Sequence, residues 1–246
     1  MESLDKYSST FRGINFTSSD NGCSDSIGHG TAIIDTILRV ENNVEIIMCK
    51  IFEDVPENDA SALIRILEYI YENVECNILH MSFGITQCEQ FSKLKAICDS
   101  FVDKQTIMVS AFDNMGSVSY PAAFNNVVGV DSCRSSYAKN NYIFIDGSIV
   151  NIDLNIGMRR VKVKNENKIF IGSSFSAAHI TGLIAKHLNA GVGKNRISEE
   201  LKANAAKIIE YPIPSREKTK VFDIKKVVKA IAFPFNKEMH SLVRVC

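Results

Sequence analysis

The feature that most constrains this fold is an alternation along the chain between short apolar runs and longer runs with helical spacing. Residues 44–52, 76–83, 106–112 and 126–130 are rich in β-branched and apolar residues and predict strands. Apolar residues spaced three and four apart predict helices over about 59–74 and 90–102. This order is typical of βα units, so we expect an α/β protein with a mostly parallel sheet and helices on both faces.

The pattern changes in the second half of the chain. From 142 to 171 the apolar runs are shorter and are separated by Gly147, Gly157 and residues 165–167, which indicates hairpin-like excursions. Helices are expected over 175–190, 198–209 and 222–231, the second with Glu199 and Glu200 in its first turn.

Composition excludes several classes of protein. Of the 246 residues, 46% are hydrophobic, and 28 basic side chains balance 28 acidic ones. A chain without net charge is a poor candidate for a generally basic nucleic-acid binder. No run approaches the roughly 18 apolar residues of a membrane span, so neither nucleic acid nor a membrane is an expected partner.

The N-terminus and the cysteines indicate the compartment. The N-terminal residues lack the basic start and apolar run of a secretory signal, so we expect a cytoplasmic protein. The seven cysteines form no CxxC pair, which favours buried thiols in a reducing compartment over a zinc site. We therefore expect no metal and no cofactor.

Charge is distributed unevenly. Residues 1–75 carry 14 acidic and 5 basic side chains, whereas residues 186–230 carry 11 basic and 5 acidic ones. Solvated faces of opposite sign would explain this distribution. The functional alternative is an acidic cleft that attracts basic peptides.

Three segments combine glycine with a side chain capable of chemistry. In GHGTAIIDTIL (28–38), His29 stands at the start of a predicted helix; in SAFDNMG (110–116), Asn114 follows a predicted strand; in GSSFSAAHITG (172–182), Ser174 enters a helix of small residues. A hydroxyl at a helix N-terminus lies near partly positive N–H groups, which favour a nearby oxyanion. Caps and turns are the alternative use of each residue taken alone.

Taken together and in this order, the three segments resemble those of the subtilisin-like serine peptidases (subtilases), whose nucleophile segment typically reads GTSMAxPHVAG. Three further segments are similar: 77–84 to VINMSLG, 119–130 to YPAxxxNVIxV and, more loosely, 151–157 to VDVxAPG. The resemblance runs from about residue 13 to about residue 231. It implies a subtilisin-like peptidase domain over 1–232, N-terminally incomplete, followed by a C-terminal tail over 233–246.

The resemblance also implies roles for the three side chains. His29 would be the general base and Ser174 the nucleophile, because a serine hydroxyl needs a base to take its proton. Asn114 and the backbone N–H of Ser174 would donate to the oxyanion of the tetrahedral intermediate.

Further residues are expected to contact a peptide substrate. Ser82, Phe83 and Gly84 would form one wall of the substrate channel and bind the peptide backbone as an added strand. Asp113 stands where the family commonly has glycine, beside the specificity pocket, which suggests a preference for a basic residue before the cut. His80 replaces the usual asparagine of the VINMSLG segment.

The chain departs from the family at the catalytic aspartate. The family order is Asp, His, Ser, with the Asp on a strand roughly thirty residues before the His, whereas here only 28 residues precede His29. Asp5, Asp20 and Asp25 are the nearby carboxylates that could substitute. A truncated sequence and a degenerate pseudo-protease are the two explanations, and the intact segments around His29 and Ser174 favour truncation. The loop after the His29 helix is also too short for the family's calcium site.

The expected function is therefore that of a serine endopeptidase acting on a peptide or protein through an acyl-enzyme, with trimming of a precursor peptide as one role. The alternative is a catalytically impaired homologue that binds peptides or a partner. A lipase or esterase is disfavoured because no GxSxG elbow surrounds Ser174. The sequence carries no signal for an oligomeric state.

Overall fold

Among the residues that the structure describes, the central sheet has six strands and is mostly parallel. A computed structural model describes residues 10–17, 22–23, 25, 27–51, 60–132, 141–163 and 166–211. The strand order is β10-β6-β7-β5-β4-β3, and only the β6–β7 pair is antiparallel. The strands are β3 (Ile78–Met81), β4 (Ile107–Ala111), β5 (Val127–Asp131), β6 (Ile143–Asp146), β7 (Ile152–Asp153) and β10 (Lys207–Glu210).

Two smaller sheets accompany the central one. β1 (Thr10–Asn15) pairs in parallel with β2 (Glu45–Lys50), and β8 (Arg159–Val163) forms an antiparallel hairpin with β9 (Glu166–Phe170). The hairpins expected between residues 142 and 171 are confirmed by the β6–β7 and β8–β9 pairs. β1 was not predicted, because its six residues TFRGIN contain neither an apolar run nor a clean alternation.

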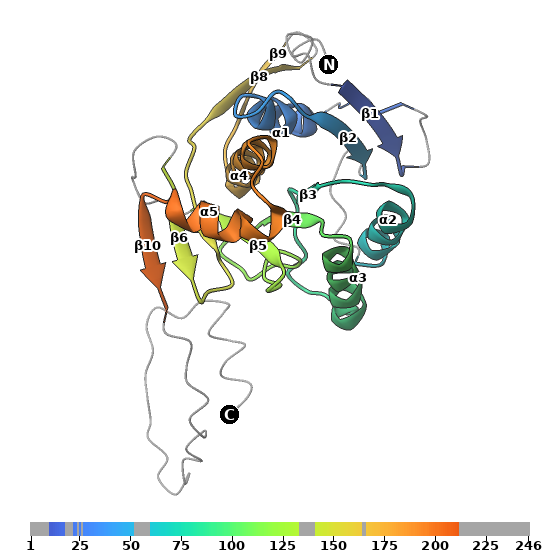
Figure 1. The fold of residues 1–246 in the computed structure, drawn as a ribbon. Coiled ribbons are helices and arrows are strands. Elements are labelled where there is room, and N and C mark those ends of the chain that lie inside the picture. The colour runs from blue at the N-terminus through green and yellow to red at the C-terminus, as the bar shows by residue number, and fades with distance from the viewer. Residues whose placement is uncertain are drawn as a thin grey trace, which may run out of the picture. The chain divides into compact units, whose positions relative to one another are not determined.

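Helices cover both faces of the sheet, as Figure 1 shows. One apolar core joins the sheet to α1 (His29–Leu38), α4 (Ser173–Asn189) and α5 (Ile197–Ala203). A second core joins it to α2 (Ala60–Asn73) and α3 (Phe91–Asp103). The expected α/β class with a mostly parallel sheet is confirmed. No helix of the described residues is both long and apolar enough to cross a membrane.

α1 and α4 approach each other very closely at Gly182. A β-carbon at this position would lie 2.7 Å from Val40 Cβ and 2.9 Å from the carbonyl oxygen of Ile37. Most of α4 is fully buried, and its small residues allow it to lie between α1 and the sheet. The N-termini of these two helices carry the predicted base and nucleophile.

The predicted helix over 198–209 is wrong in its second half. α5 ends at Ala203, and the Asn204 side chain donates to the carbonyl oxygen of Glu200 at 2.9 Å. Residues 207–210 form β10, which pairs in parallel with β6. A tertiary contact therefore overrode the helical pattern: KIIE supplies two β-branched residues to an edge strand. The predicted helix over 222–231, the boundary at 232 and the tail over 233–246 lie outside the described residues.

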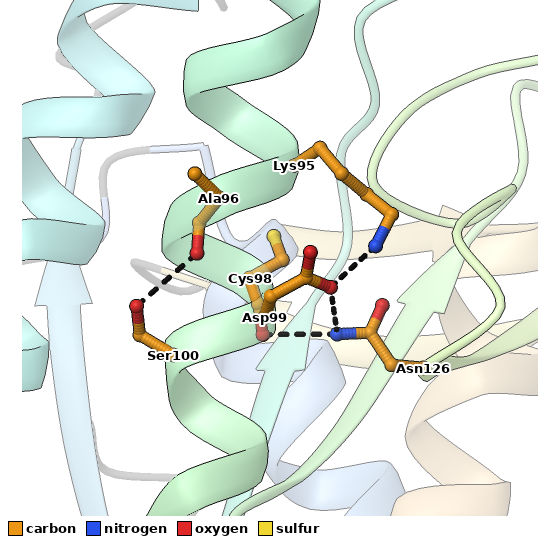
Figure 2. A network of polar contacts seen from close by, with 6 residues as sticks. All are labelled: Lys95, Ala96, Cys98, Asp99, Ser100 and Asn126. Atoms are coloured by element: carbon orange, nitrogen blue, oxygen red, sulfur yellow. Dashed lines mark hydrogen bonds and ion pairs between the residues drawn. The ribbon is translucent and has the colours of Figure 1, made fainter.

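A polar network fixes α3 to the start of β5 (Figure 2). The amide nitrogen of Asn126 donates to the Cys98 carbonyl at 3.0 Å and to the Asp99 carboxylate at 3.1 Å. Lys95 pairs with the same carboxylate. Because Asn126 immediately precedes β5, this network sets where the strand begins.

The described thiols are unbridged and at least half-buried: Cys23, Cys49, Cys76, Cys88 and Cys98. Burial raises the pKa of Cys98 to about 12 and that of Cys49 to about 11. Burial also raises the pKa of Cys76. The remaining two cysteines, Cys133 and Cys246, lie outside the described residues.

Candidate active site

His29 is the first residue of α1, and an aspartate caps the helix beneath it. Gly28 has φ 88°, a left-handed conformation that favours glycine and turns the chain into the helix. The Asp25 carboxylate accepts the N–H groups of Gly28 and Thr31, each at 2.7 Å, and the Thr31 hydroxyl at 2.8 Å. The first four N–H groups of a helix lack acceptors within it; Asp25 satisfies two of them and complements the helix dipole.

The imidazole of His29 lies against two aromatic rings. Its centroid is 5.3 Å from that of Phe175, the residue after Ser174, and 6.0 Å from that of Phe170 on β9. Burial lowers the pKa of His29 below its ordinary value of 6.5, and the nearby charge of Asp25 opposes that shift in part. The ring is therefore neutral at pH 7 and can accept a proton.

Ser174 is the second residue of α4 and is buried. Its hydroxyl donates to the carbonyl oxygen of Ser82 at 3.2 Å. Between the two described side chains of Ser174 and His29 there is no hydrogen bond. The contact of His29 with Phe175 nevertheless brings the imidazole beside the start of α4.

Asn114 is held by the residue next to the predicted nucleophile. Its Oδ1 accepts the N–H of Ser173 at 2.9 Å, while the Ser173 hydroxyl donates to the carbonyl of Phe112 at 2.6 Å. This fixes the amide with Oδ1 toward the helix, so Nδ2 is its donor end on an exposed residue. Gly172 makes the arrangement possible: it has φ 127°, and a β-carbon there would lie 2.7 Å from Asn114 Oδ1.

The predicted substrate wall and Asp113 meet at one residue, Ser119. A β-carbon on Gly84 would lie 2.8 Å from Ser119 Cβ, and the Ser119 hydroxyl accepts the N–H of Asp113 at 3.0 Å. The Asp113 carboxylate accepts the N–H of Met115 at 2.9 Å, which closes a turn. The side chain of Phe83 packs on the core that includes α2 and α3.

Sequence reasoning assigned no role to His80, Thr181 or Ser173. His80 and Ser173 contact predicted site residues, and Thr181 contacts His80. His80 bonds to Thr181 and to Ser82, and Ser173 orients Asn114. Signals for two of them existed. His80 and Ser82 are two apart in the predicted strand over 76–83, where they would share a face, and Thr181 lies two helical turns after Ser174.

Of the three candidate carboxylates, Asp25 is the one the structure describes; Asp5 and Asp20 lie outside the described residues. Asp25 is also the only acidic residue described before His29. It does not hydrogen-bond to His29, because its two oxygens serve the cap. The part of the chain that the structure describes has no group of three or more His, Cys, Asp or Glu side chains able to hold a metal.

Comparisons with known proteins address the family and the fold. Residues 2–217 match the profile of the Subtilase family. Subtilisin DY of Bacillus licheniformis is 22% identical over 207 residues, covering 76% of this chain and 74% of its own length.

Two solved structures share the fold. A cold-adapted subtilisin-like serine proteinase has a TM-score of 0.61 at 18% identity, with 81% of this chain and 85% of that one covered. A lanthipeptide protease has a TM-score of 0.60 at 14% identity, with 79% and 73% covered. The profile match over nearly the whole chain, together with this fold, shows that the chain belongs to the subtilase family.

Proposed function

We propose that this protein is a serine endopeptidase with Ser174 as nucleophile, His29 as general base and Asn114 as oxyanion donor. The observation that carries the proposal is the arrangement at the start of α4. Ser173 fixes Asn114 with its Nδ2 as donor end, and Ser174 follows directly on the same helix. A nucleophile thus stands beside a preorganised donor, and His29 lies against the next residue.

The reaction follows from these positions. The Ser174 hydroxyl leaves the Ser82 carbonyl, gives its proton to His29 and attacks the peptide carbonyl carbon. The oxyanion accepts hydrogen bonds from Asn114 Nδ2 and the N–H of Ser174, and His29 then protonates the departing amine. Water releases the acyl group by the same steps in reverse. Catalytic hydrogen bonds are often long or absent before substrate binds, so the present Ser174 contact is compatible with this route.

The substrate is a peptide that lies along residues 82–84 as an added strand. Trimming of a precursor peptide is the role we favour, in keeping with the similarity in fold to a lanthipeptide protease. The cytoplasm is the compartment we propose, on the composition of the sequence and its thiols.

A second candidate function is peptide binding without turnover. One observation favours it: no carboxylate among the described residues hydrogen-bonds to His29, and Asp25 serves the helix cap instead. An imidazole without such a carboxylate is a poorer base. Removal of the carboxylate from triad proteases lowers turnover by about 10⁴-fold.

Labelling with a fluorophosphonate separates the two functions. We expect the protein to react with the probe, Ser174→Ala to abolish labelling, and His29→Ala to slow it by at least about 10³-fold. Ser92→Ala, at the exposed start of α3, is the matched control and should label normally. Labelling that persists in Ser174→Ala would place the nucleophile elsewhere. A folded wild-type protein that never labels would favour the binding function.

Asn114→Leu tests the oxyanion donor. We expect kcat on a peptide substrate to fall by about 10²- to 10³-fold with little change in KM, because the donor acts on charge that develops in the transition state. Asn43→Leu, in the exposed turn after α1, should leave both constants unchanged. A change in KM alone would assign Asn114 to substrate binding instead.

Asp25→Asn tests the electrostatic effect of the cap on His29. Burial already lowers the pKa of His29, so the acid limb of the pH profile of kcat/KM should have its midpoint below pH 6.5. The Asp25 charge raises that pKa. Asparagine keeps one oxygen acceptor for the helix end and removes the charge, so the limb should move to lower pH.

An NMR titration of His29 in the wild-type protein and in Asp25→Asn measures the same change in the pKa of His29 without relying on turnover. Asp103→Asn, at the exposed end of α3, is the control. An unmoved His29 titration in Asp25→Asn would show that the carboxylate does not act on the base.

Asp113→Asn tests the proposed preference for a basic residue before the cut. The asparagine can keep the turn with Met115 while removing the charge. We expect the ratio of kcat/KM for Lys or Arg over Leu substrates to fall by up to about fivefold, the effect of a partly exposed ion pair. Asp103→Asn serves as the control, and an unchanged ratio in Asp113→Asn would refute the preference.

A further inference from the structure

A histidine that the mechanism does not use lies directly behind the predicted site. His80 is on β3, the strand that leads into the predicted substrate wall, and both of its ring nitrogens have hydroxyl partners. Nδ1 is 2.9 Å from Thr181 Oγ1 on α4, and Nε2 is 2.5 Å from Ser82 Oγ. His80 therefore bridges the helix of the nucleophile and the wall of the substrate channel.

Ser82 connects this bridge to Ser174 through two hydrogen bonds. The Ser174 hydroxyl donates to the Ser82 carbonyl at 3.2 Å, and the Ser82 hydroxyl is 3.5 Å from the Ser174 carbonyl. These two contacts are long, whereas the contact of Ser82 with His80 is short. The orientation of the Ser82 hydroxyl is thus set mainly by His80.

Both neutral tautomers of His80 can make the two ring contacts, and the contact of Ser82 with Ser174 selects between them. With the Ser82 hydroxyl donating toward the Ser174 carbonyl, its oxygen accepts a hydrogen bond from His80 Nε2–H. Nδ1 is then unprotonated and accepts the Thr181 hydroxyl. Burial and, to a smaller extent, the neighbouring His29 lower the pKa of His80 to about 4, which is consistent with a neutral ring.

We propose that His80 is a positioning residue: through Nε2–H to Ser82 and Nδ1 to Thr181, it fixes the nucleophile helix and the substrate wall in register. This proposal rests on the proposed function, because the register matters only if Ser174 attacks a peptide held along residues 82–84. Thr181 is seven residues after Ser174, so the bridge clamps α4 two turns beyond the nucleophile.

The experiment uses isosteres that keep one contact at a time. Gln places its amide near the position of Nε2 and retains the bond to Ser82; Asn places its amide near Nδ1 and retains the bond to Thr181. We expect His80→Leu to lower kcat by about 10- to 100-fold with KM within about twofold, the effect of a displaced reacting group. His80→Gln should recover most of the loss, and His80→Asn should recover less.

Two further measurements separate positioning from a loss of stability. The double variant Ser82→Ala/His80→Leu should lower kcat no more than His80→Leu alone, because His80→Leu already removes the contact that Ser82→Ala would remove. His187→Asn, in the last turn of α4, is the control and should leave kcat unchanged. Variants of His80 whose kcat matches the wild-type value, or whose loss follows unfolding in urea, would overturn the proposal.

The tautomer provides a readout that does not need turnover. ¹⁵N–¹H correlation spectra should show His80 with a protonated Nε2 and an unprotonated Nδ1, and Thr181→Val should shift the Nδ1 resonance. A protonated Nδ1 would overturn the proposed bridge even in a protein without activity. An inactive wild-type protein that has the expected tautomer would instead contradict the proposed peptidase function and leave the bridge in place.

Discussion

The close contact between α1 and α4 at Gly182 is the constraint on which the site depends. Each helix carries one predicted reacting group at its N-terminus, so their separation determines whether the imidazole reaches the start of α4. Gly182 permits that separation, since a β-carbon there would meet Val40 and the Ile37 carbonyl. Helix packing at Gly182 therefore determines how the predicted reacting groups at the two N-termini lie relative to each other, as expected for close-packed interiors that transmit small displacements.

Different polar groups stabilise the N-termini of α1 and α4. Asp25 completes the N-terminus of α1 with a carboxylate, whereas α4 begins at a glycine with φ 127° and is joined to Asn114 through Ser173. A carboxylate suits a helix end beneath a base because its charge favours the imidazolium. Beside the proposed oxyanion a carboxylate would be unfavourable, and the neutral amide of Asn114 lies at that helix end instead.

Much of this could be predicted from sequence, since the strands and helices around the sheet have strong periodicity and the three segments around His29, Asn114 and Ser174 are local motifs. The rest depends on contacts between distant residues. β10 forms because β6 offers an edge, and the two β-branched residues of KIIE do not by themselves distinguish it from a helix end. The Thr181 bond to His80 joins residues 101 apart, and the cap by Asp25 depends on a turn that no propensity specifies.

Burial of the thiols also has a consequence for redox chemistry. The reactive form of cysteine is the thiolate, and with a pKa of about 11 only about one Cys49 side chain in ten thousand is ionised at pH 7. The fraction at Cys98 is smaller still. The low thiolate fraction makes these two thiols poor targets for oxidants and alkylating reagents.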